Sequence, residues 1–206
     1  MRLPASPPKL LRKLLSQCYW NLPNTQNKIY LTFDDGPTPE VLPFILKTLD
    51  SYKIPATFFC VGENMAKYPD LVKEMLNRNH VVGNHTYNHL SGWRVKNESY
   101  FENIEKFNQL YASNLFRPPY GRMRKSQAKH LSEKYKLIMW DVLSYDYNKR
   151  LSPENCYKNV LNNTQSGSLI VFHDNQKALH NLTYVLPRSI DSLLNKGFVF
   201  DAIRFT

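Results

Sequence analysis

The stretch IYLTFDDGP, from Ile29 to Pro37, largely decides what this chain can be. Its first five residues are uncharged and rich in β-branched and aromatic side chains, which is typical of a buried strand. Two adjacent carboxylates and a Gly-Pro pair then predict a turn. Two like charges side by side are costly unless a cation lies near them, so Asp34 and Asp35 predict a metal site. A turn that only caps the following helix is the structural alternative.

The composition predicts one folded domain without a membrane span. The chain has 206 residues, of which 42% are hydrophobic and 13% aromatic, and no run of 18 apolar residues. The basic, Pro-containing start, Met1 to Ser16, lacks the apolar run and small-residue cleavage site of a secretory signal, which leaves the compartment open between the cytoplasm and peripheral association with a membrane or wall. The three cysteines are far apart, so we expect neither a disulfide framework nor a Cys-x-x-Cys metal site.

The charge favours a basic, solvated surface, which is also able to attract anions. The formal net charge is +10 and the pI is about 9.5, which favours attraction to an anionic wall polymer or membrane surface. The Lys and Arg residues are spread along the chain without interleaved aromatic residues, so a nucleic-acid function is not expected. The basic amphipathic stretch Lys9 to Leu15 predicts a short helix that docks on the domain or lies on an anionic surface. We expect a monomer.

Strand and helix patterns alternate along the chain. Strands are expected at 29–33, 56–61, 80–84, near 116, and at 136–142, 168–172 and 198–203. Helices are expected at 40–52, 64–77 (with Asn64 as cap), 99–112, 126–135, 152–163 (with Ser152 as cap) and 182–195. This alternation predicts a parallel sheet with helices outside it, as in a TIM-like barrel or a doubly wound sheet. We expect a domain at 28–206, with residues 1–27 as a basic extension packed on it.

Polar residues follow the ends of the predicted strands. They are Asp34 and Asp35, His85 and His89, Arg117, Asp146, and His173. In a parallel barrel the carboxyl ends of the strands meet at one face, where such folds place their active sites. These groups are therefore expected to converge.

The two histidines predict the remaining metal ligands. His85 and His89 are four residues apart, so on one helical turn they share a face and can bind one ion. Two imidazoles and one carboxylate leave coordination positions open, which is typical of a catalytic site. These ligand types favour Zn²⁺, with Co²⁺, Ni²⁺ or Fe²⁺ as alternatives.

With these motifs in place, the sequence resembles the polysaccharide deacetylases of the NodB-homology type, the fourth family of carbohydrate esterases. The resemblance rests on TFDDGP from Thr32, HTYNH from His85, RPPYG from Arg117 and FHD from Phe172, and it runs from about Lys28 to the C-terminus. It implies a distorted (β/α) barrel of seven to eight strands. It also implies hydrolysis of the N-acetyl group of an N-acetylglucosamine-type saccharide, such as peptidoglycan or chitin, to acetate and a free amine.

The resemblance also implies a role for each motif residue. Asp34 is the general base, and Asp35, His85 and His89 bind the metal. Arg117 orients Asp34, the backbone N–H of Tyr120 helps to hold the oxyanion, and His173 protonates the departing amine. The residues expected to contact the substrate are Tyr147, Pro119 and Asp146.

One position departs from the family pattern. Leu143 stands where the family usually has an aspartate that supports the acid histidine. Asp141 and Asp146 are both candidates to replace it, because without a carboxylate partner His173 would be a poor acid at neutral pH. Two alternative functions remain open from the sequence: an O-acetyl esterase of the xylan type with the same site, and a carbohydrate-binding homologue with weakened catalysis.

Overall fold

The computed structural model describes residues 5–205; the outer ends of the expected extension and domain, residues 1–4 and 206, lie outside this range. The strands are β1 (Cys18–Tyr19), β2 (Lys28–Asp34), β3 (Thr57–Cys60), β4 (Val81–Asn84), β5 (Leu115–Phe116), β6 (Lys136–Ile138), β7 (Val142–Leu143), β8 (Leu169–His173) and β9 (Val199–Phe200). The helices are α1 (Lys9–Leu14), α2 (Leu42–Tyr52), α3 (Gly62–Lys67), α4 (Pro69–Asn77), α5 (Asn97–Leu110), the 3₁₀ turn η1 (Pro119–Gly121), α6 (Lys125–Leu131), α7 (Pro153–Asn163) and α8 (Leu179–Asn195).

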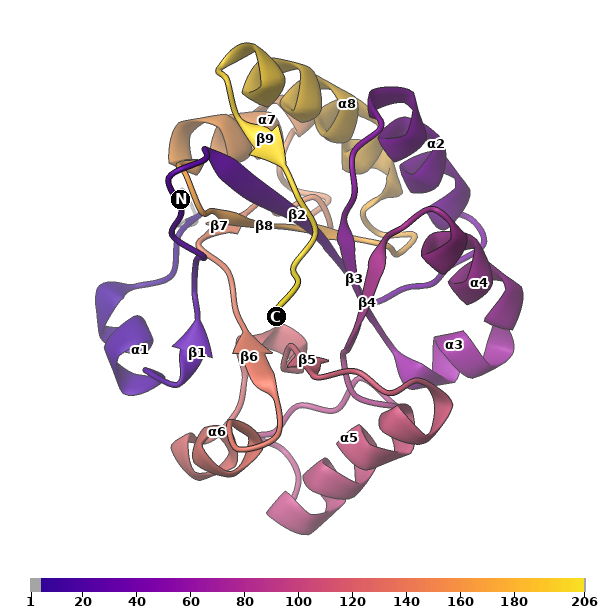
Figure 1. Ribbon diagram of the computed structural model, residues 1–206, viewed down its shortest axis with the longest axis vertical. Coiled ribbons are helices and arrows are strands. Elements are labelled where there is room, and N and C mark those ends of the chain that lie inside the picture. The colour runs from indigo at the N-terminus through magenta and orange to yellow at the C-terminus, as the bar shows by residue number, and fades with distance from the viewer. Residues whose placement is uncertain (1–4, 206) are drawn as a thin grey trace.

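These strands form one parallel sheet that curls into a distorted barrel. Within the described residues, eight strands follow the order β1-β6-β5-β4-β3-β2-β8-β7, and β9 pairs with β2 beside this path. Figure 1 shows the strands around the middle of the molecule and the long helices outside them. The prediction of a distorted barrel of parallel strands is therefore confirmed.

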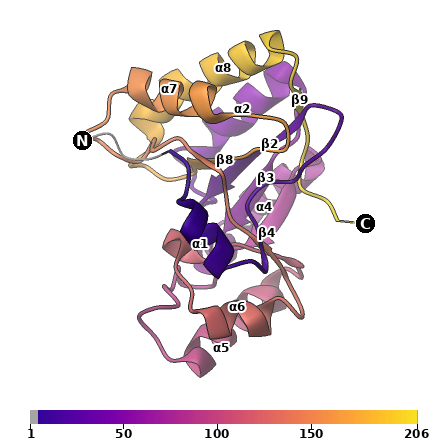
Figure 2. The ribbon, with the colours of Figure 1, turned by 90° about the vertical axis from the view of Figure 1, so that its left-hand side faces the viewer.

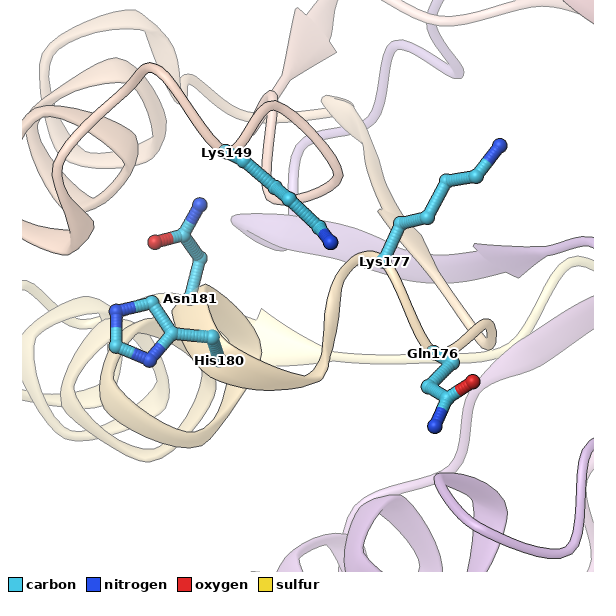
Figure 3. A pocket seen from close by; sticks show the side chains of 5 residues that line it. All are labelled: Lys149, Gln176, Lys177, His180 and Asn181. Atoms are coloured by element: carbon cyan, nitrogen blue, oxygen red, sulfur yellow. The ribbon is translucent and has the colours of Figure 1, made fainter.

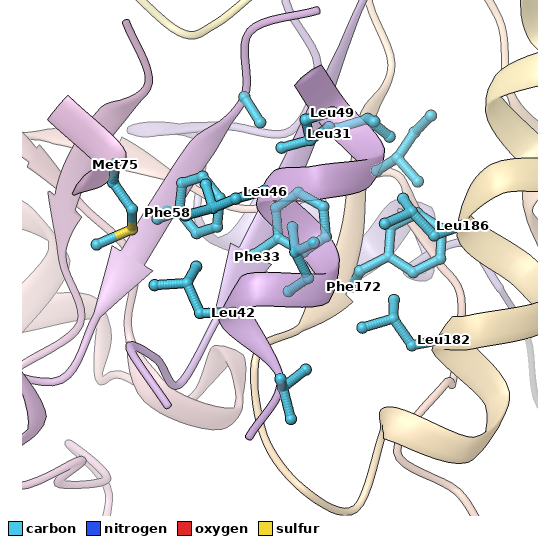
Figure 4. Packing of buried hydrophobic residues seen from close by; sticks show 14 of the residues in the cluster. Leu31, Phe33, Leu42, Leu46, Leu49, Phe58, Met75, Phe172, Leu182 and Leu186 are labelled. Carbon is cyan, nitrogen blue, oxygen red and sulfur yellow. The ribbon is translucent and has the colours of Figure 1, made fainter. Parts of the chain in front are cut away.

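The alternation of side chains along β2 explains how the barrel is filled. Ile29, Leu31 and Phe33 are fully buried and belong to the cluster between the sheet and the outer helices. Figure 4 shows Phe33 in this cluster beside Phe58 and Phe172, with ring centroids 5.0 and 6.0 Å from it. The intervening residues point the other way, since successive side chains of a strand alternate between its two faces. Tyr30 accordingly belongs to a second cluster.

Two groups of helices lie at opposite ends of the molecule. Figure 2 shows α2, α7 and α8 together at one end, and α5 and α6 at the other, with strands between them. The predicted cap of α7 is confirmed: the Ser152 hydroxyl accepts a hydrogen bond from the Asn155 N–H, and Pro153 occupies the first turn. No helix within residues 5–205 has both the length and the apolar content that a bilayer crossing requires.

Two expected elements are each divided in the structure. The predicted helix 64–77 is two helices, α3 and α4, because Pro69 begins a new helix after Tyr68. Asn64 is not a helix cap, since α3 already begins at Gly62. The predicted strand 136–142 is also two elements, β6 between β1 and β5, and β7 beside β8 at the far end of the strand order.

The N-terminal segment contributes to the barrel. The sequence predicts an extension packed on the domain; in the structure Leu15 and Trp20 are buried in a core cluster with residues of α5 and α6. In addition, β1 pairs in parallel with β6, and Asn21 forms an antiparallel bridge with Ser168 beside β8. This segment therefore links the two sides of the curled sheet.

Candidate active site and metal centre

The last residues of β2 and β8 bring two chemically active side chains together. Asp34 pairs in register with His173 across these neighbouring strands. Both residues lie two positions after an inward-facing residue, Thr32 on β2 and Val171 on β8, so both point into the mouth of the barrel. The strand register thus places a carboxylate and an imidazole on the same wall.

Asp35 turns away from the strand and faces the two expected histidines. Its φ of 81° lies in the left-handed region, which ends the extended geometry of β2. Its Oδ1 is 3.1 Å from Nε2 of His89 and 3.6 Å from Nε2 of His85. One donor atom from each of the three residues lies within 4.8 Å of the others. The structure therefore brings the predicted ligand set together.

The two histidines meet through a loop and not through a helical turn, so the predicted helical geometry is wrong. Residues 85–90 follow β4 as irregular chain, and Thr86 and His89 have φ values of 65° and 55°. The side chain of Asn84 accepts a hydrogen bond from the Thr86 N–H at 2.8 Å and fixes the start of this loop. Two left-handed residues therefore bring both imidazoles to the same side.

Hydrogen bonds leave the correct atoms free for a metal. The Nδ1 of His85 lies 2.7 Å from the carbonyl oxygen of Arg117, so Nδ1–H donates there and Nε2 faces Asp35. Burial lowers the pKa of His85 to about 4, so the imidazole is neutral, as a ligand must be. Burial raises the pKa of Asp35, but the hydrogen bond with His89 and the charges of the neighbouring histidines lower it by more, so the pKa lies well below its ordinary value. The carboxylate is therefore ionised, and the donor set fits a divalent ion.

Two asparagines that the sequence did not identify as site residues hold the Asp35 segment. The side-chain amide of Asn175 donates to Asp35 Oδ2 at 2.6 Å, leaving Oδ1 towards the histidines. The amide of Asn64 donates to the backbone oxygen of Asp35 at 2.8 Å. Asn175 lies two residues after His173, close to the FHD motif, and this proximity is the only sequence signal that pointed to it.

Arg117 is fully buried and reaches Asp34 across the barrel. Its guanidinium donates to Asp34 Oδ1 and to the Thr32 hydroxyl, both at 2.7 Å. It also donates to the carbonyl oxygens of Ile138 and Met139, at 3.2 and 2.9 Å. These four hydrogen bonds hold the guanidinium in one position, and its charge-assisted bond to Oδ1 in turn orients the Asp34 carboxylate.

Asp146 supports His173, which resolves the choice between the two candidate carboxylates. Asp146 Oδ1 lies 2.8 Å from His173 Nδ1, and its Oδ2 accepts the His173 backbone N–H at 2.8 Å. Burial lowers the pKa of His173, but Asp146 and the more distant Asp35 and Asp34 raise it by more, so that the pKa is about 9. His173 is therefore protonated at neutral pH.

Asp141 and Asp146 occupy different places. Asp141 accepts hydrogen bonds from the Ser168 hydroxyl and the Leu169 N–H and makes none to His173. The predicted contact between Asp146 and the substrate is wrong. Asp146 has no exposed surface, because its carboxylate lies behind the imidazole of His173. Leu143 lines the pocket in front.

These groups surround one pocket of about 830 Å³ at the mouth of the barrel. Its walls include Asp34, Asp35, His85, His89, Tyr120, Trp140, Leu143, Tyr147 and His173. The Tyr147 ring lies edge-on to His173 at a centroid distance of 4.6 Å. Pro119 is buried and is not among the described residues that line this pocket, so a substrate contact by its side chain is not supported.

Tyr120 lines the pocket beside His89. The residue is 61% exposed, its ring lies edge-on to that of His89 at a centroid distance of 4.6 Å, and its φ is 60°. Its backbone N–H makes no hydrogen bond within residues 5–205, whereas Gly121 and Arg122 after it donate to Pro118 and Pro119. The Tyr120 N–H is therefore available to a ligand.

Asp174 explains why the turn after Asp35 contains glycine. The Asp174 carboxylate accepts hydrogen bonds from the Thr38 hydroxyl at 2.8 Å and the Thr38 N–H at 3.2 Å. A Cβ atom on Gly36 would lie 1.9 Å from Asp174 Oδ2, which no side chain can tolerate. Burial raises the pKa of Asp174 to about 7.

Comparison with known proteins places these features in context. Residues 21–137 match the family described as polysaccharide deacetylase. A peptidoglycan-N-acetylglucosamine deacetylase of Bacillus cereus is 33% identical over 202 residues, which cover 93% of this chain and 94% of the relative. The enzyme PgdA of Listeria monocytogenes, named for the same activity, is 32% identical over 87% of this chain and 38% of its own length. A crystal structure of a peptidoglycan N-acetylglucosamine deacetylase superposes with a TM-score of 0.86 at 34% identity, covering 96% of this chain and 95% of that one.

Proposed function

This chain belongs to the polysaccharide deacetylase family, and from that membership we propose that it removes the N-acetyl group from an N-acetylglucosamine-type sugar of a peptidoglycan-like glycan. The products are acetate and a glycan with a free amine. The observation that carries the proposal is the arrangement of a convergent Asp35–His85–His89 cluster between a carboxylate, Asp34, and a protonated imidazole, His173.

Asp35, His85 and His89 would hold the metal ion. Two imidazole nitrogens and one carboxylate oxygen are ligands that Zn²⁺ accepts well, and we propose Zn²⁺, with Co²⁺, Ni²⁺ or Fe²⁺ able to occupy the same site. When bound, such an ion polarises the acyl carbonyl and lowers the pKa of a water molecule. Asn175 fixes the orientation of Asp35, and the Arg117 carbonyl fixes that of His85.

Asp34 is the base that accepts the proton of the attacking water. Its Oδ1 is held by Arg117, while no described residue donates to its other oxygen, and Asp34 lines the pocket. The charge-assisted bond with a buried guanidinium keeps the carboxylate oriented towards the pocket. The free N–H of Tyr120 is suited to donate to the negative charge that develops on the acyl oxygen.

His173 is the acid that protonates the nitrogen of the leaving group. Asp146 keeps Nδ1–H engaged, so the Nε2–H is the proton that can be transferred. The replacement of the family aspartate by Leu143 therefore does not leave the acid without a partner. This argues for an active enzyme over a carbohydrate-binding homologue with weakened catalysis.

The test is product release from defined glycans. The protein loaded with Zn²⁺ is incubated with chitotetraose, with a peptidoglycan fragment and with acetylated xylan, and both acetate and free amine are measured. We expect equal amounts of acetate and amine from the first two, and loss of both with a chelator. Acetate without amine, or acetate from xylan alone, would instead identify an O-acetyl esterase.

We further propose that the chain acts as a monomer on an anionic wall. A single chain contributes every group of the site, from Asp34 to His173. The net charge of +10 favours approach to an anionic polymer. Sedimentation of the protein with purified cell walls at low and high salt tests the second point, since electrostatic binding weakens as salt rises.

A further inference from the structure

A second cavity, lined by basic residues, lies beside the catalytic pocket. It has a volume of about 620 Å³ and is lined by Lys149, Gln176, Lys177, His180 and Asn181, which we call the basic cavity. Figure 3 shows Lys149 extending from the segment after β7 towards the segment between β8 and α8 that carries Gln176 and Lys177. The cavity is therefore formed by the two segments that also hold Tyr147 and His173.

The basic cavity has unbalanced positive charge. No acidic side chain is among its described lining residues, and neither Lys149 nor Lys177 forms an ion pair within residues 5–205. His180 and Asn181 belong to the first turn of α8, a helix of 17 residues whose N-terminus has no side-chain cap. The free N–H groups of that turn add partial positive charge on the same side. The cavity is therefore suited to an anion.

The basic cavity adjoins the catalytic pocket. Gln176 and Lys177 line both, and Lys149 lies only two residues after Tyr147, whose ring packs against His173. A glycan whose N-acetyl group lies between Asp34 and His173 can extend past Tyr147 and place its next sugar at the basic cavity. The two spaces therefore lie side by side, with Gln176 and Lys177 in the wall that they share.

On the basis of the proposed function, we propose that the basic cavity binds an anionic group, a carboxylate or a phosphate, on the sugar next to the one that is deacetylated. The site then selects anionic glycans over neutral glycans of the chitin type. Lys149 and Lys177 supply the charge, and the reacting sugar is held as before. The substrate class is an N-acetylated glycan with an anionic neighbouring residue.

The test compares substrates that differ only in that anion. The first is a tetrasaccharide of alternating N-acetylglucosamine and N-acetylmuramic acid with free lactyl carboxylates. The second is its methyl ester, and the third is the methyl ester with a phosphate on the muramic acid O6. For the wild-type chain we expect kcat/KM to be about 10-fold higher for the first than for the second, with the difference removed at high salt. Recovery with the third substrate assigns phosphate as well, and no recovery restricts the cavity to carboxylates.

The variants Lys149→Ala and Lys177→Ala are each expected to reduce this ratio about 3-fold, and together to remove it. Both side chains are exposed, so the variants are expected to fold. Lys196→Ala is the matched control, because Lys196 lies at the other end of α8, about 25 Å away along the helix, and should leave the ratio unchanged. Equal wild-type kcat/KM for carboxylate and ester, or a ratio that survives the double variant, would overturn the inference while leaving deacetylation established. No amine release from any substrate would instead overturn the proposed function.

Discussion

Replacing Asp146 by asparagine should move the alkaline limb of the activity profile to lower pH. His173 must be protonated to act as the acid, and its pKa of about 9 lies above the ordinary 6.5. Among the groups that raise this pKa, Asp146 contributes most, through its charge and its 2.8 Å hydrogen bond. A raised histidine pKa means that the acid form is present below about pH 9 and is lost as the pH rises through that value.

The size of the effect follows from the titration of one proton. At about pH 8 a group with a pKa of 9 is about 90% protonated, whereas one with a pKa of 6.5 is about 3% protonated. In Asp146→Asn burial still lowers the pKa of His173, so kcat/KM should fall at least about 30-fold at pH 8. At about pH 6 a pKa of 6.5 gives a loss of only about 1.3-fold, and although a lower pKa gives a larger loss, the loss at pH 6 stays well below the loss at pH 8. A bound dication lowers both pKa values, so the predicted quantity is the difference between the two profiles.

The assay is kcat/KM for amine release from pH 5 to 10 with the metal-loaded protein. Asp141→Asn is the matched control, because Asp141 is also a buried carboxylate with two accepted hydrogen bonds but does not contact His173. Both variants should lose stability in urea, since each leaves a buried donor without its charged acceptor. Only Asp146→Asn should shift the alkaline limb. An unshifted limb in that variant, or an equal shift in Asp141→Asn, would refute the assignment of His173 and Asp146.

Three further predictions concern the groups that hold the site. Arg117→Ala leaves a buried carboxylate unpaired and should lower the free energy of unfolding in urea by about 3 kcal/mol or more. Gly36→Ala should lose about 2 kcal/mol and most activity, because the added Cβ would lie 1.9 Å from the Asp174 carboxylate. Asn175→Ala frees the second oxygen of Asp35 and should weaken Zn²⁺ binding about 10-fold or more in competition with a chelator.

Matched controls separate these effects from general damage. Arg188→Ala removes an exposed arginine that donates to a carbonyl within α8, and should cost less than about 1 kcal/mol. Gly197→Ala adds a Cβ with no heavy atom within 4 Å, so it should cost only the strain of its left-handed φ, about 1 kcal/mol, and keep activity. Asn163→Ala removes an exposed asparagine and should leave Zn²⁺ affinity unchanged. Equal losses in a variant and its control would contradict the corresponding prediction.

The fold could be predicted because the strands carry strong patterns. The apolar stretch of β2 and its stop at Asp34 indicate a buried parallel strand, and helices follow in regular alternation. The errors lie where tertiary contacts decide the boundary. Pro69 starts a second helix within a single amphipathic pattern. The chain also leaves β6 after Ile138 and joins the far side of the sheet as β7, although Met139 and Trp140 continue the apolar pattern of β6.

The site could be predicted only in part, for a similar reason. The positions directly after strands identify Asp34, Asp35, Arg117 and His173, because parallel strands end at one face. The carboxylate that supports His173 could not be assigned from the sequence, because Asp141 and Asp146 both lie within a few residues of Leu143. Only the path of the segment between β7 and α7 decides between them. The paths of loops depend on single left-handed residues, and a spacing pattern does not encode these.

The most direct test of the metal centre measures Zn²⁺ binding and acetate release on the same protein sample. Chelator-stripped protein is titrated with Zn²⁺ by calorimetry, and acetate release from chitotetraose is measured at each step. The geometry of Asp35, His85 and His89 predicts one ion per chain, activity that rises in proportion to occupancy, and the loss of both in His89→Ala. Full activity of the stripped protein, or tight 1:1 binding that persists in His89→Ala, would contradict this assignment.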